Sequence, residues 1–281
     1  MSGLRIAALT ALAILAFAGN SLLCRAALAG GTIDAAGFTT VRLVSGAVVL
    51  WWIVRLRAGD GAVAGHWASA LALFVYAAGF SFAYLDLSAA TGALLLFGAV
   101  QATMIGRGLV RGERLRPLQW MGLCIAIGGL VALLLPGWSA PSPRAASLML
   151  SAGVAWGVYS LRGARRGDPL RETAGNFLRA VPFALALSVA TLGHGHGSAT
   201  GVGLAIVSGA LTSGIGYALW YAALPALQAT QAATVQLSVP LIAALGAVVL
   251  LDELMSLRLV GTGIAIVGGV ALAILAGRRS A

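Results

Sequence analysis

Apolar runs of about 20 residues, separated by short polar breaks, recur along the whole chain. A run of that length crosses the hydrocarbon core of a bilayer as an α-helix, because the core has no water to satisfy backbone polar groups. The chain is therefore predicted to be an all-α integral membrane protein. The ten predicted spans cover residues 4–28, 38–56, 67–86, 89–109, 118–136, 145–162, 173–192, 201–222, 227–250 and 257–276.

The charge content supports this class. Charged residues make up 9% of the chain, whereas a soluble domain carries about 25%. The net charge of +10 would suggest nucleic acid in a soluble protein. Here the basic residues are arginines of short loops, so we predict a lipid bilayer and no nucleic acid as the partner. Cys24 and Cys124 both fall in apolar runs, and their number and spacing predict neither a metal site nor a disulfide.

The arginines are distributed unequally between the two sides of the predicted spans. Thirteen lie at the termini and in the second, fourth and sixth loops, against two, Arg144 and Arg258, on the other side. Cytoplasmic loops carry the excess of basic residues, so both termini are predicted to be cytoplasmic, which requires an even number of spans. The first run is too long for a cleaved signal peptide. We expect a multi-pass protein of a bacterial inner membrane.

The two halves of the chain resemble each other. "IAIGGLVALL" at 125–134 and "IAIVGGVALA" at 264–273 agree at seven of ten positions, at an offset of 139. "AFAGNSL" and "AWGVYSL" repeat at the same offset, and "LSAATGA" and "LQATQAA" at 140. The chain thus divides into repeats at 1–140 and 141–281. Five spans in each repeat force opposite orientations, which predicts two inverted-topology repeats of five helices.

Inverted repeats are typical of secondary transporters, where the substrate site lies between the repeats near the midplane of the membrane. Two mirrored halves have two arrangements of similar energy, open to opposite sides. The repeat therefore predicts transport by alternating access.

These motifs also resemble a known family. The aromatic residues Phe17 and Trp156, the turns "GERLRPLQWMG" and "DELMSLRLVG", and the glycine-rich spans after them are similar to the drug/metabolite transporter superfamily with two EamA-type domains. Pro240 matches a proline of that pattern, and Val100 departs from it in the first half. Within the superfamily the chain looks most like the amino-acid exporters of the YddG type. The resemblance implies export of small amino acids or related metabolites, with no cofactor and no enzymatic activity.

Charged residues are absent from the middle of the predicted spans. All eight acids map to loops or span ends, whereas a proton-coupled antiporter usually keeps a carboxylate within the membrane. This disfavours proton coupling through a buried acid. It also makes a cationic drug an unfavourable choice as the main substrate. Arg25, Arg42 and Arg179 map near span ends. Snorkelling toward head groups is the favoured interpretation, and a vestibule that attracts carboxylates is the alternative.

Neutral polar and aromatic side chains remain as candidates for a substrate path, because polar groups in a bilayer face protein or water. A pocket of amides and aromatic rings suits a small amino acid with an apolar side chain. The predicted substrate-path residues are Asn20, Tyr76, Phe80, Tyr84, Gln101, Trp156, Tyr159, Gln231 and Gln236.

Other features have structural interpretations. The aromatic group Tyr217, Trp220 and Tyr221 is interpreted as a belt at the membrane interface. The pairs Gly128–Gly129 and Gly268–Gly269 are interpreted as helix-packing sites, and Pro240 as a kink within the ninth span. His194 and His196 are assigned to a solvated loop, and no metal site is predicted.

Alternative functions stay open at this stage. The same fold could export other metabolites or drugs. An intramembrane enzyme would need a nucleophile and a base, or metal ligands, at one depth, and the sequence offers neither. A receptor or scaffold has no need of a second, mirrored state. The sequence predicts no oligomeric state.

Overall fold

The computed structural model describes residues 2–58, 63–112, 114–137, 140–163, 168–227 and 235–277. The predicted helical membrane fold is confirmed in these ranges, and their one β-type pairing is an isolated bridge between Ile33 and Gly197. The helices are α1 (Gly3–Ala29), α2 (Ala35–Ala58), α3 (Trp67–Ala83), α4 (Ala89–Val110), α5 (Pro117–Leu134), α6 (Pro143–Gly163), α7 (Pro169–Ala190), η1 (Leu192–His194), α8 (Ala199–Val207), η2 (Ser208–Ile215), α9 (Gly216–Ala223), η3 (Leu224–Ala226), α11 (Ser238–Leu251) and α12 (Leu257–Gly277).

Seven of the described helical segments are long and apolar enough to cross a membrane, with α8, η2, α9 and η3 counted as one continuous span. The apolar helices α3 and α11 are shorter, at 17 and 14 residues. α6 has 21 residues but is less hydrophobic, because Arg144 and Arg162 lie within it. α6 therefore depends on neighbouring helices, and it packs against both α3 and α4.

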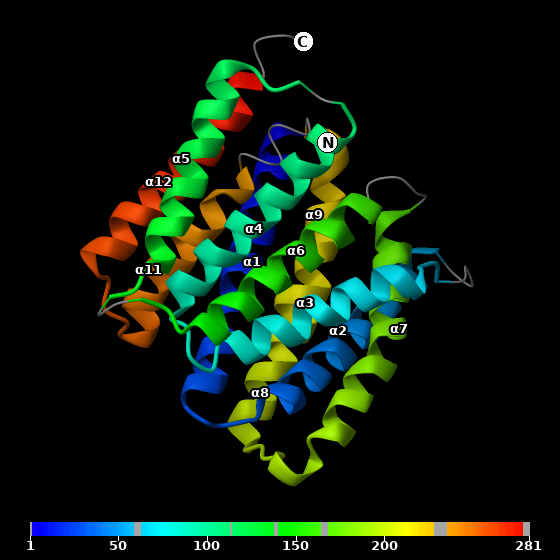
Figure 1. Ribbon diagram of the computed structural model, residues 1–281. Coiled ribbons are helices and arrows are strands. Elements are labelled where there is room, and N and C mark those ends of the chain that lie inside the picture. The colour runs from blue at the N-terminus through cyan, green and yellow to red at the C-terminus, as the bar shows by residue number, and fades with distance from the viewer. Residues whose placement is uncertain are drawn as a thin grey trace.

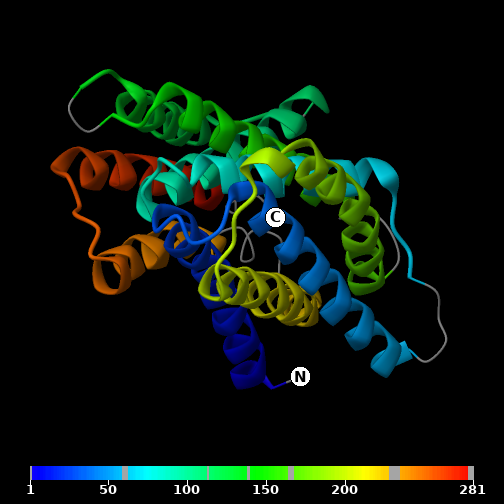
Figure 2. The ribbon, with the colours of Figure 1, turned by 90° about the horizontal axis from the view of Figure 1, so that it is seen from below.

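The helices form layers that Figures 1 and 2 show from two directions. Seen from below, α11 and α12 lie on one side of the molecule and α2 and α7 on the other. Between these groups, α1 packs against α11 and against the α8–η2–α9 span. α2 packs along α7, and α5 packs along α12. Helices distant in sequence therefore lie side by side, and the space between them can hold a site.

α5 and α12 run antiparallel. An added Cβ at Gly122 would meet Gly269 and Ala273, whereas one at Gly129 would meet Ala265 and Ile266. Contacts thus move backward along α12 as they move forward along α5. Antiparallel packing of the fifth and tenth helices is what inverted repeats require, and the division at residue 140 stays a prediction.

Arg258 at the start of α12 holds the end of α5. Its guanidinium donates to the carbonyl oxygens of Ala132, Leu133 and Leu135. The last carbonyls of a helix have no partner within the helix and carry the negative end of its dipole. The Arg258 guanidinium supplies both hydrogen-bond donors for these carbonyl oxygens and a positive charge near the negative end of the dipole. This explains why a charged residue is tolerated where α12 begins beside the end of α5.

Only one glycine of each pair faces the neighbouring helix. The sequence analysis had interpreted both glycines of each pair as helix-packing sites. Gly128 and Gly268 have nothing within 4 Å of an added Cβ. At Gly269 that atom would lie 2.5 Å from the Gly122 carbonyl oxygen and 2.6 Å from the Ala126 backbone nitrogen. Backbone atoms cannot move aside without separating the helices.

Gly269→Ala is therefore expected to destabilise the fold by about 1–3 kcal/mol, the usual range for overpacking. Gly268→Ala is the matched control, because it adds the same methyl group to the next residue of the same helix, where there is space. Thermal unfolding in detergent should show a lower midpoint for Gly269→Ala alone. Equal midpoints for the two variants would contradict the close packing of α5 and α12.

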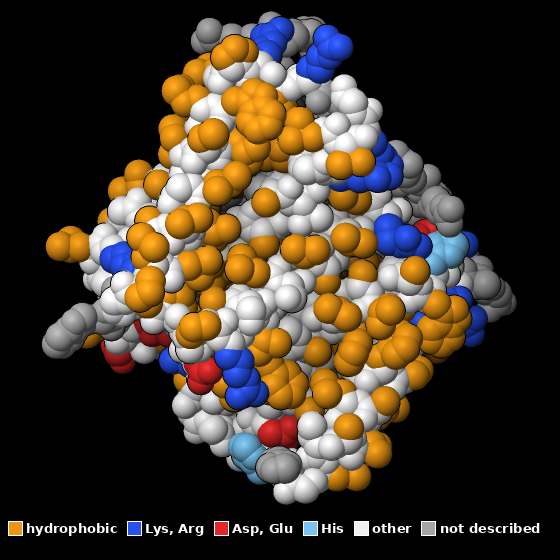
Figure 3. All heavy atoms as spheres, in the orientation of Figure 1, with side chains coloured by type: hydrophobic (Ala, Val, Ile, Leu, Met, Phe, Trp, Pro, Cys, Tyr) orange, Lys and Arg blue, Asp and Glu red, His pale blue; other side chains and the backbone are white. Residues whose placement is uncertain are grey.

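Hydrophobic side chains are spread over the whole face shown in Figure 3, and most of the arginines on it lie along its upper and right margins. Large apolar residues such as Leu245, Val249 and Ile264 are well exposed. A surface of this kind is stable against lipid tails rather than water. The chain is a membrane-embedded, multi-pass helical protein.

Two predicted spans differ from the observed helices in ways that matter for the site. The third span was expected to reach residue 86, but α3 ends at Ala83 because the chain turns before α4. The ninth span was expected to be continuous over 227–250. Instead, residues 235–236 are helical, the chain turns at Leu237, and α11 starts at Ser238. Residues 228–234 of that predicted span lie outside the described residues, and Pro240 lies in the first turn of α11, three residues after the turn at Leu237.

Candidate functional site

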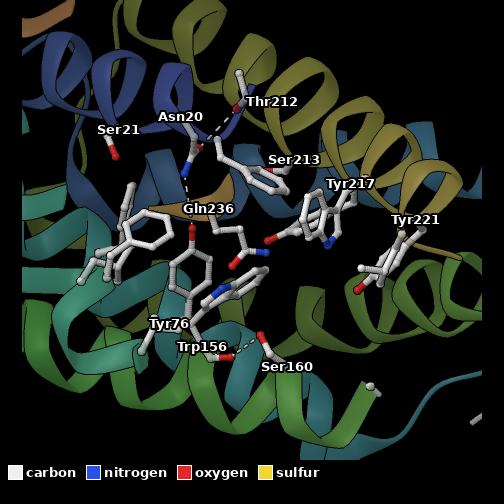
Figure 4. A pocket seen from close by; sticks show the side chains of 18 of the residues that line it. Asn20, Ser21, Tyr76, Trp156, Ser160, Thr212, Ser213, Tyr217, Tyr221 and Gln236 are labelled. Carbon is white, nitrogen blue, oxygen red and sulfur yellow. Dashed lines mark hydrogen bonds between the residues drawn. The ribbon is translucent and has the colours of Figure 1, made fainter. Parts of the chain in front are cut away.

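A cavity of about 490 Å³ lies among the central helices. This volume is within the range of small-molecule sites. Its walls come from α1, α2, α3, α4, α6 and the α8–η2–α9 span, with Gln236 projecting into it (Figure 4). The lining residues are Phe17, Asn20, Ser21, Arg42, Tyr76, Phe80, Leu96, Phe97, Val100, Gln101, Met104, Trp156, Ser160, Gly163, Pro169, Thr212, Ser213, Tyr217, Trp220, Tyr221, Leu224, Leu227 and Gln236.

An aromatic cluster forms one wall, with Trp156 of α6 at its centre. The Trp156 ring lies 4.8 Å from the ring of Tyr76 and 5.3 Å from that of Tyr217, measured between centroids. Phe17 continues the cluster at 5.7 Å from Tyr217. The Ser160 hydroxyl donates to the Trp156 carbonyl oxygen at 2.9 Å (Figure 4). Rings at these separations interact favourably and give the cavity a large, rigid apolar surface.

Asn20 is the centre of a polar cluster that links three helices. Its amide nitrogen donates to the Tyr76 hydroxyl at 3.3 Å, and its amide oxygen accepts from Ser208 at 2.8 Å and Thr212 at 3.3 Å. Figure 4 shows Asn20 pointing between Tyr76 and Thr212. Buried amides are stable only when their donors and acceptors are paired. Asn20 thus joins α1 to α3 and η2 and lines the cavity as well.

η2 is a π-helix of eight residues. Such segments are rare, and they occur often at functional sites. Thr212 and Ser213 of η2 line the cavity. Gly209 of η2 lies so close to the Arg42 backbone that an added Cβ would overlap the Arg42 carbonyl oxygen. This close approach places η2 directly beside Arg42 of α2.

Arg42 is the largest departure from the sequence analysis, which interpreted it as a residue near a span end that snorkels toward head groups. Its side chain points into the protein and is only 2% exposed. The Arg42 Nη2 donates to the Tyr76 hydroxyl at 2.9 Å, and Nε donates to Ser213 Oγ at 3.3 Å. Its guanidinium also lies 5.2 and 5.1 Å from the ring centroids of Tyr76 and Phe80. A buried cation therefore lines this cavity, contrary to the expectation of purely neutral walls.

The predicted substrate-path residues separate into three groups. Asn20, Tyr76, Phe80, Gln101, Trp156 and Gln236 line the cavity. Tyr84 lies just past the end of α3 and directs its hydroxyl to the Ala89 carbonyl oxygen at 3.3 Å. Tyr159 stacks behind Trp156 at 5.3 Å and donates to Thr173. Gln231 lies outside the described residues.

The interpretation of Tyr217, Trp220 and Tyr221 as a belt at the membrane interface is wrong. All three line the cavity, and Tyr217 and Trp220 are 4% and 6% exposed. They belong to α9, which follows the π-helix and packs against α1. The sequence alone places these rings at a span end and does not reveal which neighbours cover them.

The cavity reaches the end of the molecule that carries most of the arginines. Its lining continues to Gly163 at the end of α6, Pro169 at the start of α7 and Leu227 after η3. Arg162 and Arg171 flank these positions. We call this the arginine-rich end.

At the opposite end, a set of contacts closes the bundle. Arg25 Nε pairs with Glu253 Oε1 at 3.1 Å, and Arg25 Nη1 donates to the carbonyl oxygens of Tyr84 at 3.0 Å and Leu85 at 3.1 Å. Glu253 Oε2 also accepts from the Ala89 backbone nitrogen at 2.8 Å, at the start of α4. We call these five residues the Arg25–Glu253 tie. Arg25 lies one turn beyond Ser21 on α1, so the tie lies just past the cavity.

A second connection lies at the same end. The Asp34 carboxylate accepts from the backbone nitrogens of Gly37 at 2.8 Å and His196 at 3.2 Å. The Asp34 backbone nitrogen donates to the His196 carbonyl oxygen at 2.9 Å. His196 lies in the exposed loop between α7 and α8, as expected, and its backbone joins that loop to Asp34. No group of three potential metal ligands occurs among the described residues.

Comparisons with known proteins agree with this architecture. Residues 143–275 match the EamA-like transporter family. An uncharacterised protein of Pseudomonas aeruginosa is 55% identical over 265 residues, which cover 94% of this chain and 92% of that protein. The second half of this chain therefore carries an EamA-like transporter domain. A protein of known crystal structure superposes with a TM-score of 0.71 over 99% of this chain and 100% of its own, at 20% identity. That likeness concerns the fold alone.

The family match and the helical membrane fold together support a membrane transporter of the drug/metabolite type. The match covers the second half of the chain, including α6, η2 and α9, which supply much of the cavity wall.

Proposed function

We propose that this protein, which carries an EamA-like transporter domain, exports small amino acids or related metabolites with apolar side chains from the cytoplasm of a bacterium by alternating access. The observation that carries the proposal is a cavity of about 490 Å³ that extends to the arginine-rich end and stops at the Arg25–Glu253 tie. Basic residues gather on the cytoplasmic side of membrane proteins. The described state then faces the cytoplasm and is ready to receive a substrate for export.

The lining suits a small amphipathic molecule. The rings of Trp156, Tyr76 and Tyr217 offer apolar surface, while amide and hydroxyl groups lie close by. Pockets of this kind bind the body of a ligand through rings and orient it with a few polar groups.

The transport cycle follows from the two halves of the proposed inverted repeat. Rocking one half against the other would open the Arg25–Glu253 tie and close the arginine-rich end. Among the described residues, the cavity lining includes no aspartate or glutamate. Facilitated movement down a gradient is therefore the simplest cycle, since a buried acid is the usual means of proton coupling.

Counterflow into proteoliposomes tests the proposal. Vesicles loaded with an unlabelled amino acid should accumulate the labelled form, and a panel of amino acids should favour apolar and aromatic side chains. Accumulation should be independent of a pH gradient. Lack of counterflow for every amino acid and related carboxylate, from protein shown to be folded, would overturn this function. Export of other metabolites or of drugs would then become the leading alternative.

A further inference from the structure

Among the residues that the structure describes, Arg42 has no acidic partner. Among the described residues, Glu253 pairs with Arg25, Asp168 with Arg171, and Asp34 bonds backbone nitrogens. No carboxylate lines the cavity among these residues. The guanidinium is charged at all physiological pH values, and an unpaired charge is expensive to bury. A cation retained here without a counter-ion indicates that its partner comes from outside the protein.

The hydrogen bonds of Arg42 are also incomplete. Nε and Nη2 donate to Ser213 and Tyr76, but Nη1 has no acceptor among the described residues. Arg42 lines the cavity. Guanidinium groups bind carboxylates with two parallel hydrogen bonds. An anion that enters from the cavity can supply both the missing acceptor and the missing charge.

The neighbours of Arg42 hold the guanidinium in place. The Tyr76 hydroxyl accepts from both Arg42 and Asn20, and the rings of Tyr76 and Phe80 lie about equally far from the guanidinium carbon, at 5.2 and 5.1 Å. Cation–π contacts and hydrogen bonds to neutral groups hold the side chain without neutralising it. The site is thus prepared for an anion before a ligand arrives.

The same surroundings specify the rest of the ligand. Tyr76 touches both Arg42 and Trp156, so a molecule bound to the guanidinium extends directly onto the aromatic wall. An ammonium group would meet only neutral polar groups, and it would be repelled by the cation.

We propose that Arg42 binds a carboxylate of the transported molecule, and that the cavity prefers a monocarboxylate with an apolar or aromatic body over the corresponding amino acid and excludes the corresponding amine. This inference rests on the proposed transport function and names the charge class of its substrate. Amine exclusion follows from the positive charge of Arg42, and the preference over the zwitterion follows from the lack of an acidic group for its ammonium.

The test uses three probes with one body: 3-phenylpropionate, phenylalanine and phenethylamine. Uptake into proteoliposomes at neutral pH, corrected with protein-free vesicles, should be highest for 3-phenylpropionate and at background for phenethylamine. In Arg42→Gln the 3-phenylpropionate flux should fall at least tenfold, and Arg42→Lys should restore part of it. Arg107→Gln, which removes the same charge from an exposed position, should behave like the wild type.

A binding measurement on the wild type keeps the test independent of how the variants fold. 3-Phenylpropionate should raise the thermal unfolding midpoint of the detergent-solubilised protein, and phenethylamine should leave it unchanged.

The possible failures are distinguishable. Equal transport of the amine and the acid by the wild type, or an unchanged ratio of the two in folded Arg42→Gln, overturns the role of Arg42 and leaves the transport function standing. A higher flux of phenylalanine than of 3-phenylpropionate overturns the preference for the anion. No transport of any probe by folded wild-type protein overturns the proposed function and this inference with it.

Discussion

Trp156→Ala is expected to lower the ratio of maximal rate to KM for transport at least tenfold. Trp156 is the centre of the aromatic wall, with Tyr76, Tyr217 and Tyr159 all within 5.3 Å between ring centroids. Each aromatic pair contributes about 0.5–1.5 kcal/mol of interaction free energy in addition to the effect of the area it buries. A difference of about 1.4 kcal/mol corresponds to a tenfold change in an equilibrium constant. Uptake of the best substrate as a function of its concentration measures the effect.

Two further variants separate a role in the cavity from a role in folding. Trp156→Phe keeps a ring at the same position and should recover most of the rate. Trp52→Ala removes the same side chain from a site that is 55% exposed, and it should leave transport unchanged. A Trp156→Ala protein with wild-type kinetics would show that the substrate does not touch this wall.

Glu253→Gln is expected to open the end of the molecule that the Arg25–Glu253 tie closes. The side chains of the pair are only 21% and 15% exposed, so the pair is stronger than a surface salt bridge. Hydrogen bonds to charged groups contribute about 1.5–3 kcal/mol. Losing one such contribution shifts the equilibrium between the closed and open states roughly 10- to 100-fold toward the open state.

Labelling of a cysteine at Ser21 measures this shift, because Ser21 lines the cavity one turn before Arg25. A membrane-impermeant maleimide, applied from the side of the tie, should react faster in Glu253→Gln than in the parent protein. Asp252→Asn is the matched control. It removes a charge from the adjacent, exposed residue, whose φ of 51° asparagine also adopts. Equal rates in all three proteins would show that the tie does not hold this end closed.

The fold could be predicted from the sequence because the bilayer constrains it so strongly. Runs of about 20 apolar residues have one stable form in lipid, the helix, and glycine and proline mark their ends. The starts of α5 at Pro117 and of α7 at Pro169 fit proline's preference for the first turn, although the seventh span was predicted to start only at residue 173. The repeated glycine motif correctly pointed to close helix packing, but the sequence did not tell which glycine of each pair makes the contact.

Part of the cavity could be predicted from helical spacing. Tyr76 and Phe80 are four residues apart on α3, so they share a face, and both line the cavity. Tyr84 continues the same spacing in sequence. It lies beyond Ala83, where the helix ends, and its side chain therefore follows the turn and leaves the cavity.

Arg42 and Tyr217 show what the sequence could not provide. Arg42 lies seven residues after the start of α2, about 10 Å along the helix, and from that depth an arginine can reach either the head groups or the protein interior. The direction is decided by η2, whose glycine lets it pack against α2 beside the arginine. η2 also sets the position of Tyr217 on α9, and no simple sequence signal marks a π-helix. A useful signal was nevertheless available: an arginine within an apolar span is a functional candidate by default.

The central claim, a cavity open at the arginine-rich end and closed at the other, is tested most directly by the side from which Ser160 can be labelled. In a background with Cys24→Ala and Cys124→Ala, reference cysteines at Arg57 and Leu192 mark the two sides of the membrane, because both positions are exposed and lie at opposite ends of the bundle. A cysteine at Ser160 should react with an impermeant maleimide from the Arg57 side only, and a transported substrate should slow the reaction. Reaction from the Leu192 side only, or from neither side in folded protein, would contradict this account.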